Sequence, residues 1–130
     1  MQNKQDQAGA RPLDPHPYRL GRSFSLGRNK HFQTVYRRGK RQAGRFLVLT
    51  SLHAKALKVG FSVSGKVGKA VKRNRIRRML QEDFRHMRMH VLPGRYVISV
   101  RVGATEATHE QLTNELHYLF RKAGRMKNEG

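Results

Sequence analysis

The chain of 130 residues contains no cysteine and no tryptophan. The absence of Cys excludes disulfide frameworks, thiol nucleophiles and thiolate-bound metals, and it fits a reducing compartment. No apolar run approaches the roughly 18 residues of a membrane helix, and the longest such stretches cover only residues 46–49 and 96–100. The first 21 residues lack the apolar centre of a secretory signal. We therefore predict a cytoplasmic protein without a membrane span.

Acidic residues are also scarce, since 8 Asp and Glu face 28 Lys and Arg and give a formal net charge of +20. Between Asp14 and Glu82 the chain runs for 67 residues without a carboxylate while it carries 18 Lys or Arg. Such a surface attracts a polyanion through phosphate neutralisation and counterion release, whereas a merely solubilising surface mixes both signs. An anionic membrane is the alternative partner, but it favours a helix with a lipid-seeking apolar face. The most basic helix needs that face for a core, so we predict a nucleic-acid partner and no membrane partner.

The length suits a single domain, because domains of roughly 100 to 150 residues are the commonest size. Residues 1–21 contain Pro12, Pro15 and Pro17 among Gln, Gly and Arg, a composition typical of a flexible tail. We therefore predict one folded domain at residues 22–125, with a short basic tail at residues 126–130.

The first half of the domain combines one helix with two strands. A helix is predicted after Asn29, a candidate N-cap, and before Gly39, a C-terminal stop signal. Its apolar residues at helical spacing are Phe32, Val35 and Tyr36. Residues 41–52 and 57–64 are rich in β-formers, which predicts a pair of antiparallel strands, with a short extra strand as an option at residues 40–43.

The second half combines two helices with one strand. From about residue 69 to residue 89, one helix face is apolar and carries Ile76, Met79, Leu80, Phe84 and Met87. Residues 95–102 are apolar on both faces, as in an inner strand, and a last helix begins at a capping box of Thr108 and Gln111. The order α-β-β-α-β-α, with helices covering one face of the sheet, predicts an α+β two-layer sandwich.

The densest local signal is residues 66–78, where 7 of 13 residues are basic and none is acidic. The segment opens a helix, where each exposed cation opposes the macrodipole at a cost of a few tenths to about 1 kcal/mol. Cations there make sense when a phosphate backbone crosses the helix start, because free N–H groups and Arg forks bind phosphate oxygens together. A solvated basic face is the alternative, although no acidic residue stands at i+4. The candidate RNA-binding residues are Lys66, Lys69, Lys72, Arg73, Asn74, Arg75, Arg77 and Arg78.

One enzymatic pattern is nearly complete. Residues 60–67 approach the nucleotide-binding loop G-x-x-x-x-G-K-[ST], but Val67 has no hydroxyl to hold Mg²⁺. Gly60 also falls inside a predicted strand rather than in a loop. We therefore expect no nucleotide hydrolysis by this chain.

The remaining histidine and carboxylate residues match no known metal-binding or catalytic pattern. His86 and His90 have the i, i+4 spacing of metal ligands, yet no third ligand follows at a suitable distance along the chain. The adjacent Glu82 and Asp83 diverge on a helix and form no carboxylate pair. We therefore predict neither catalytic residues nor a metal site in this chain.

The apolar positions of the first helix have two open interpretations. Phe32, Val35 and Tyr36 fit a core stripe, which is the default for apolar residues at helical spacing. The same helix is flanked by cations, namely Arg28, Lys30, Arg37 and Arg38. Aromatic rings among cations stack unpaired bases while the charges hold the strand, so single-stranded RNA is the other candidate contact.

Residues 61–78, from Phe61 through the Arg-Asn-Arg segment to Arg78, resemble the signature of the bacterial ribonuclease P protein component. That family carries an Arg-Asn-Arg helix after a glycine turn. The resemblance extends to residues 28–40, similar to the family's first helix, and to residues 116–123, and it covers about residues 20–124. Three positions depart from the usual pattern: Gly65 where a basic residue is frequent, Tyr36 where Phe is common, and Thr50 where an aromatic residue is frequent.

The resemblance implies a fold and a function. The fold is an α+β sandwich like that of a small-subunit ribosomal protein domain, with a left-handed strand-helix-strand crossover through the basic helix. The function is that of a protein subunit that assists removal of the 5′ leader from precursor tRNA by endonucleolytic cleavage. The catalytic RNA subunit carries the chemistry and requires Mg²⁺, and the protein alone binds no cofactor.

The resemblance also implies partners and residue roles. The partners are the catalytic RNA and precursor tRNA, with no obligate protein partner. The basic segment 66–78 contacts the catalytic RNA and borders the path of the leader, and the predicted leader cleft consists of Phe32, Tyr36, Arg73 and Asn74. A ribosomal protein or a general RNA chaperone is the rival interpretation, because it shares the charge. That rival predicts association with ribosomal RNA and indifference to leaders on tRNA.

Overall fold

The computed structural model describes residues 25–26 and 29–127, so the predicted N-terminal tail lies outside the described residues. The elements, in chain order and with η for a short 3-10 helix, are α1 (Asn29–Arg38), β1 (Lys40–Ala43), β2 (Leu47–Leu52), β3 (Lys58–Val63), η2 (Gly65–Val67), α2 (Ala70–Met87), η3 (Arg88–His90), β4 (Arg95–Val100), η4 (Val102–Glu106) and α3 (His109–Lys122). The predicted α+β class is confirmed, and the optional short strand is β1. In this part of the chain no helix is both long and apolar enough to cross a bilayer.

The four strands form one mixed sheet in the order β1-β2-β4-β3. β2 pairs antiparallel with β1 and β4, whereas β3 pairs in parallel with β4. The predicted pairing of β2 with β3 is therefore wrong, because β4 lies between them. β4 is apolar and buried on both faces, as is typical of an inner strand, while β3 contains Gly60 and Ser62, is less buried and serves as an edge. The hand of the β3-α2-β4 crossover stays a prediction.

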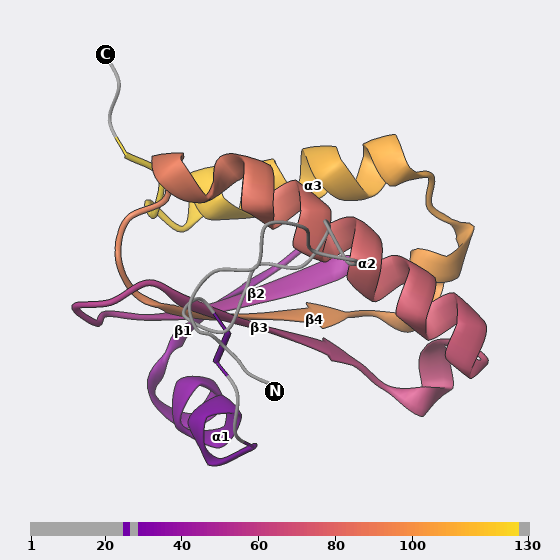
Figure 1. The fold of residues 1–130 in the computed structure, drawn as a ribbon, viewed down its shortest axis with the longest axis horizontal. Coiled ribbons are helices and arrows are strands. Elements are labelled where there is room, and N and C mark those ends of the chain that lie inside the picture. The colour runs from indigo at the N-terminus through magenta and orange to yellow at the C-terminus, as the bar shows by residue number, and fades with distance from the viewer. Residues whose placement is uncertain (1–24, 27–28, 128–130) are drawn as a thin grey trace, which may run out of the picture.

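The helices lie on both faces of the sheet (Figure 1). α2 and α3 cover one face, where the larger core includes Tyr96 and Ile98 of β4. α1 covers the opposite face, where Val35 and Val97 are fully buried. The expectation that helices cover only one face therefore holds for α2 and α3 and is wrong for α1. The reason is Val97 of β4. Alternate residues of a strand face opposite sides of the sheet, so this apolar side chain lies on the second face and must be shielded from water there.

The sequence pattern of both long helices is confirmed. In α2 the buried apolar residues are Ile76, Leu80, Phe84 and Met87. In α3 the capping box is complete, because Thr108 accepts the N–H of Gln111 and the Gln111 side chain accepts the N–H of Thr108. Both helices thus place one apolar stripe on the sheet and leave their other faces to polar groups.

A buried acidic residue joins the two helices. Asp83 of α2 is only 8% exposed. Its Oδ1 lies 2.9 Å from Nε2 of His109, and its Oδ2 accepts the Thr113 hydroxyl at 2.9 Å. Since each carboxylate oxygen has a partner, the burial of Asp83 is satisfied and holds α3 in register with α2.

The chain after α3 returns to the core. Met126 forms an antiparallel bridge with Val91, and the N–H of Lys127 donates to the carbonyl of His90 at 2.7 Å. Arg125 donates from Nη2 to the carbonyl of Pro93 at 2.6 Å. Residues 126–127 of the predicted C-terminal tail are thus bonded to the domain, and residues 128–130 lie outside the described residues.

Candidate nucleic-acid interface

The basic segment folds as a short turn followed by the start of α2. Residues 65–67 form η2, in which the Ser64 hydroxyl accepts the N–H of Lys66 at 3.3 Å. The first turn of α2 holds no acidic residue, and in the described structure Lys69 at the N-cap makes no side-chain cap. The start of α2 thus combines N–H groups that lack an intrahelical partner with a run of cations, an arrangement that suits an anion.

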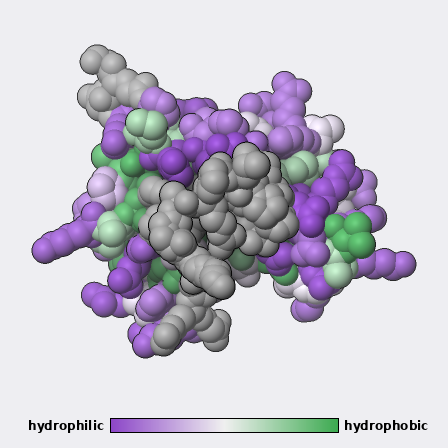
Figure 2. Space-filling view, in the orientation of Figure 1, coloured by the Kyte–Doolittle hydropathy of each residue, from purple (hydrophilic) through white to green (hydrophobic). Residues whose placement is uncertain are grey.

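All eight predicted RNA-binding residues lie on this turn and on the first half of α2. Six of them are exposed, namely Lys66, Lys69, Lys72, Asn74, Arg75 and Arg78, and two are half-buried, namely Arg73 and Arg77. Figure 2 shows mostly hydrophilic residues around the right-hand end of the molecule, where α2 begins. The structure thus presents most of the predicted set to solvent as one cationic surface.

The cations occupy two flanks of α2. At about 100° per residue, Arg73 and Arg77 fall on one side of the buried Ile76, whereas Lys72 and Arg75 fall on the other. On the first flank, Arg73 donates from Nη1 to the carbonyl of Gly68 at 2.6 Å, which ties it to the turn before the helix. A phosphate-bearing strand can therefore contact α2 from either flank.

On the same flank, Arg77 donates from Nη1 to Oδ1 of Asn74 at 2.8 Å. The bond orients the guanidinium without neutralising it, because the amide carries no charge. Arg77 therefore keeps its full positive charge for a phosphate partner.

The acidic residues of α2 are engaged elsewhere. Glu82 accepts Arg85 Nη2 at 2.7 Å and lies 3.5 Å from His86 Nε2. The hydrogen bond from Arg85 is the main cause that lowers the pKa of Glu82. Since Asp83 faces α3, the two carboxylates diverge as predicted, and neither neutralises the basic first half of the helix.

The aromatic residues of α1 differ in accessibility. Phe32 packs against the smaller core, and its ring covers Gly60, where an added Cβ would lie 2.7 Å from Phe32 Cε1. Tyr36 is 41% exposed, and its hydroxyl lies 3.1 Å from Oγ of Ser99 on β4. The two open interpretations thus separate: Phe32 packs into the fold, whereas Tyr36 presents a ring to solvent over the sheet.

The predicted leader cleft is divided by the sheet. Phe32 and Tyr36 lie on the α1 face, whereas Arg73 and Asn74 lie on α2, which covers the other face (Figure 1). The edge strand β3 lies between them, and Ser25 pairs with it at Val59. An RNA strand that contacts both groups must therefore pass from one face of the sheet to the other.

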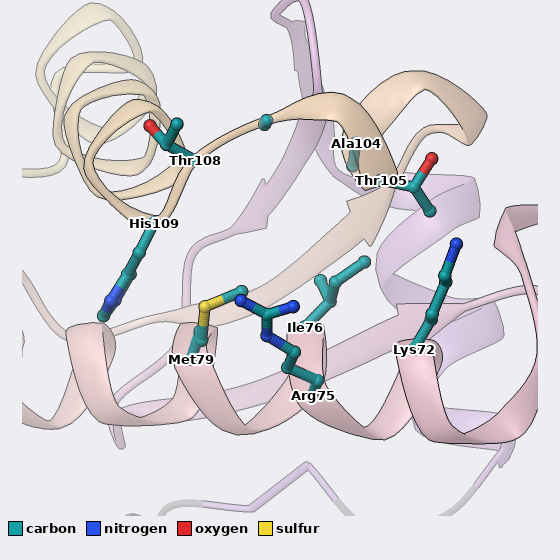
Figure 3. A pocket seen from close by; sticks show the side chains of 9 residues that line it. Lys72, Arg75, Ile76, Met79, Ala104, Thr105, Thr108 and His109 are labelled. Carbon is teal, nitrogen blue, oxygen red and sulfur yellow. The ribbon is translucent and has the colours of Figure 1, made fainter.

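A pocket opens on the other flank of α2, between that helix, η4 and the start of α3. Its volume is about 100 Å³. Lys72, Arg75 and Met79 project into it from α2, and Thr105 and His109 lie across from them (Figure 3). Two members of the predicted basic set thus share a concave site with residues that follow them by about 30 positions in the sequence.

The nucleotide-loop pattern and the two histidines occupy the following places in the structure. Gly60 lies within β3, so residues 60–67 run from a strand into η2 and form no phosphate loop before a helix. His86 belongs to α2, but His90 lies in η3 beyond the end of the helix. Across residues 25–26 and 29–127, no three His, Asp or Glu side chains gather in a way that could hold a metal ion.

Comparisons with known proteins agree with this arrangement. The family model for Ribonuclease P matches residues 20–124. The chain belongs to the ribonuclease P protein family. It is 37% identical over 113 residues to the ribonuclease P protein component of an Exiguobacterium species, with 85% of this chain and 99% of the relative covered.

Solved structures of ribonuclease P proteins share the fold. The protein from Staphylococcus aureus superimposes with a TM-score of 0.72 at 30% identity and covers 85% of this chain and 98% of its own. The protein from Thermotoga maritima, at 22% identity, superimposes with a TM-score of 0.66 and covers 78% of this chain and 97% of its own. At that identity the second likeness concerns the fold alone.

Three residues from distant parts of the chain complete the candidate interface and were not predictable from the sequence. Ser99 holds the Tyr36 hydroxyl, and Thr105 and His109 form the far wall of the pocket. No local pattern marks these residues, because each contributes through a partner that lies 26 or more positions away. The one available signal was the helix position of Met79, which belongs to the apolar stripe but is displaced toward Lys72 and Arg75.

Proposed function

We propose that this chain is the protein subunit of a ribonuclease P ribonucleoprotein and assists removal of the 5′ leader from precursor tRNA. The observation that carries this proposal is the family match over residues 20–124, which includes the entire exposed basic surface of η2 and α2. In this proposal the RNA subunit cleaves the phosphodiester bond with Mg²⁺, and the protein contributes binding.

The proposed mechanism is electrostatic. The cations of α2 neutralise phosphates where the catalytic RNA and the precursor tRNA approach each other. Reduced repulsion lets both RNA chains bind together and lowers the Mg²⁺ concentration that the RNA active site needs. Arg73 and Arg77 suit this role, because their bonds to Gly68 and Asn74 orient each guanidinium without a carboxylate.

The second part of the proposal concerns the leader. Tyr36 offers an exposed ring on the α1 face, and a base of single-stranded RNA stacks on such a ring without a sequence requirement. Phe32, one helix turn before Tyr36, packs on Gly60 and fixes α1 against the sheet. Arg73 and Asn74 then hold the phosphates of the leader after it crosses the β3 edge.

Reconstitution with the cognate catalytic RNA tests the function. We expect the protein to stimulate cleavage of precursor tRNA at low Mg²⁺, and to have no cleavage activity without the RNA. A lack of stimulation would contradict the proposal, and so would cleavage by the protein alone.

Identification of the RNA that crosslinks to the protein in cells distinguishes the proposed function from the rival interpretation. Our proposal expects the catalytic RNA and precursor tRNA. Predominant ribosomal RNA, together with equal affinity for tRNA with and without a leader, would favour a ribosomal protein or RNA chaperone instead.

A further inference from the structure

The pocket between α2, η4 and α3 combines an apolar interior with a cationic rim. Met79 and Ile76 of α2 form one apolar wall, and Ala104 and Ala107 form the other. Lys72 and Arg75 stand at the rim (Figure 3). This combination matches a flat apolar group that carries an adjacent negative charge.

The two rim cations are available to a ligand. Within the part of the chain that the structure describes, neither Lys72 nor Arg75 forms an ion pair or a hydrogen bond. The nearby acidic residues of η4 and α3, Glu106 and Glu110, do not line the pocket. The charge at the rim is therefore not neutralised from within the pocket.

The far wall of the pocket is held in place before any ligand arrives. His109 is bound through Nε2 to Oδ1 of the buried Asp83 at 2.9 Å. The Thr108 side chain is engaged in the capping box of α3. Because these groups already have partners, the pocket needs little reorganisation to bind, which lowers the entropic cost.

Size limits the ligand to one small ring system. A volume of about 100 Å³ is well below the roughly 300 to 1,000 Å³ of pockets that enclose a drug-sized molecule. A nucleobase fits this description, because its face packs on methyl groups and on a thioether such as that of Met79. Its phosphate then lies at the rim, where Lys72 and the fork of Arg75 bind anionic oxygens.

We propose that this pocket binds one unstacked nucleotide of an RNA strand, with the base between Met79 and Ala107 and the phosphate on Lys72 and Arg75. The inference rests on the proposed RNA-binding function and deepens it. In this proposal RNA contacts both flanks of α2. Arg73 and Arg77 bind it on one flank, and the nucleotide site binds it on the other flank.

Methyl NMR of the full chain tests the site. The probes are adenosine 5′-monophosphate, a single-stranded pentamer of adenylate and inorganic phosphate, each titrated while the methyl signals of Met79, Ala104 and Ala107 are followed. We expect these signals to shift with the nucleotide and with the pentamer, and to stay in place with inorganic phosphate, which lacks a base.

Two pairs of variants make the test specific. Arg75→Ala is expected to raise the Kd of adenosine 5′-monophosphate about tenfold, which corresponds to about 1.4 kcal/mol. Arg121→Ala removes the same charge from an exposed site on α3 outside the pocket and is expected to leave this Kd unchanged. Ala107→Leu is expected to abolish the Met79 shift by filling the pocket, whereas Ala56→Leu adds the same volume in an exposed loop and preserves it.

Three outcomes would overturn the inference. The first is that the methyl signals do not shift with the nucleotide or with the pentamer. The second is that they shift equally in wild type and in Arg75→Ala. The third is that they shift with the nucleotide but not with the pentamer, which would assign the pocket to a free nucleotide. Stimulation of precursor tRNA cleavage is measured separately. If the protein stimulates cleavage but its methyl signals do not shift, the nucleotide site is refuted and the proposed function is not.

Discussion

The carboxylate of Glu115 accepts the backbone N–H of Leu47 at 2.6 Å and thereby ties α3 to the start of β2. The same oxygen, Oε2, accepts the N–H of Phe46 at 2.7 Å, and Oε1 accepts the N–H of Arg45 at 2.9 Å. Three consecutive N–H groups, two in the β1–β2 turn and one at the start of β2, thus converge on one side chain. Hydrogen bonds to a charged acceptor are stronger than neutral ones, so this contact stabilises the turn that precedes the buried strand.

Glu115→Gln should destabilise the fold by about 1 to 3 kcal/mol, because the amide group replaces one acceptor with a donor that faces N–H groups. Urea denaturation measures the change. Glu106→Gln, which removes the same charge from an exposed position in η4, serves as the control and should change the free energy of unfolding little. Equal effects of both variants would mean that the destabilisation comes from the general change in charge and not from these hydrogen bonds.

Gly60→Ala should also destabilise the protein, by about 1 to 3 kcal/mol, because the new Cβ would meet the Phe32 ring and overpack the smaller core. Thermal and urea unfolding provide the measurement. Gly103→Ala is the matched control, since an added Cβ there meets no atom within 4 Å. In a double-mutant cycle, Phe32→Leu should relieve part of the Gly60→Ala penalty; strictly additive effects would contradict the close approach of the ring to Gly60.

Tyr36→Ala should weaken binding of precursor tRNA with a leader by about 1 to 3 kcal/mol, the value of one base stacked on an aromatic ring. Mature tRNA should bind as before, and Tyr36→Phe should retain most of the affinity because it keeps the ring. Tyr118→Ala removes a comparably exposed ring from α3 and serves as the control. An equal decrease in affinity for mature tRNA would place Tyr36 outside the leader path.

Arg73→Ala and Arg77→Ala should each weaken binding of the catalytic RNA and reduce the slope of log K against log salt by about one unit for each phosphate that the protein no longer neutralises. Filter binding over a series of salt concentrations gives the slope. Arg121→Ala should change neither quantity, since its position on α3 lies outside the basic segment. An unchanged slope in the two α2 variants would show that these guanidinium groups face solvent in the complex.

Tyr96 should make stability decline at high pH. Burial raises the pKa of its phenol above the ordinary value of 10.0 and outweighs the nearby Arg125, which favours the phenolate. An acid whose pKa is raised by folding contributes stability that is present below the unfolded pKa and is lost as pH rises through the folded pKa. The stability advantage of wild type over Tyr96→Phe should therefore shrink above about pH 10. A constant difference in melting temperature would contradict this coupling.

Several features were predictable because their causes are local. The apolar stripe of α2, the capping box at Thr108 and the two apolar faces of β4 each depend on residues close together in the chain. The basic segment was equally visible, since its charge is a property of the residues and not of their packing. The exposure of Tyr36 and the packing of Phe32 were not predictable, because helical spacing alone does not tell which of the two rings is buried against the sheet.

Composition and periodicity were sufficient to establish an α+β domain with a cationic helix and a polyanion as the expected partner. Contacts between distant segments decided the rest. Insertion of β4 between β2 and β3 and the placement of α1 on the opposite face depend on which apolar surfaces bury each other. The pocket beside Lys72 and Arg75 likewise exists only once α3 has docked on α2 through Asp83 and His109. These relationships join residues that lie 26 or more positions apart in the chain. Which distant segments pair depends on how all the apolar faces of the protein compete for burial, and no single segment of the sequence records the result.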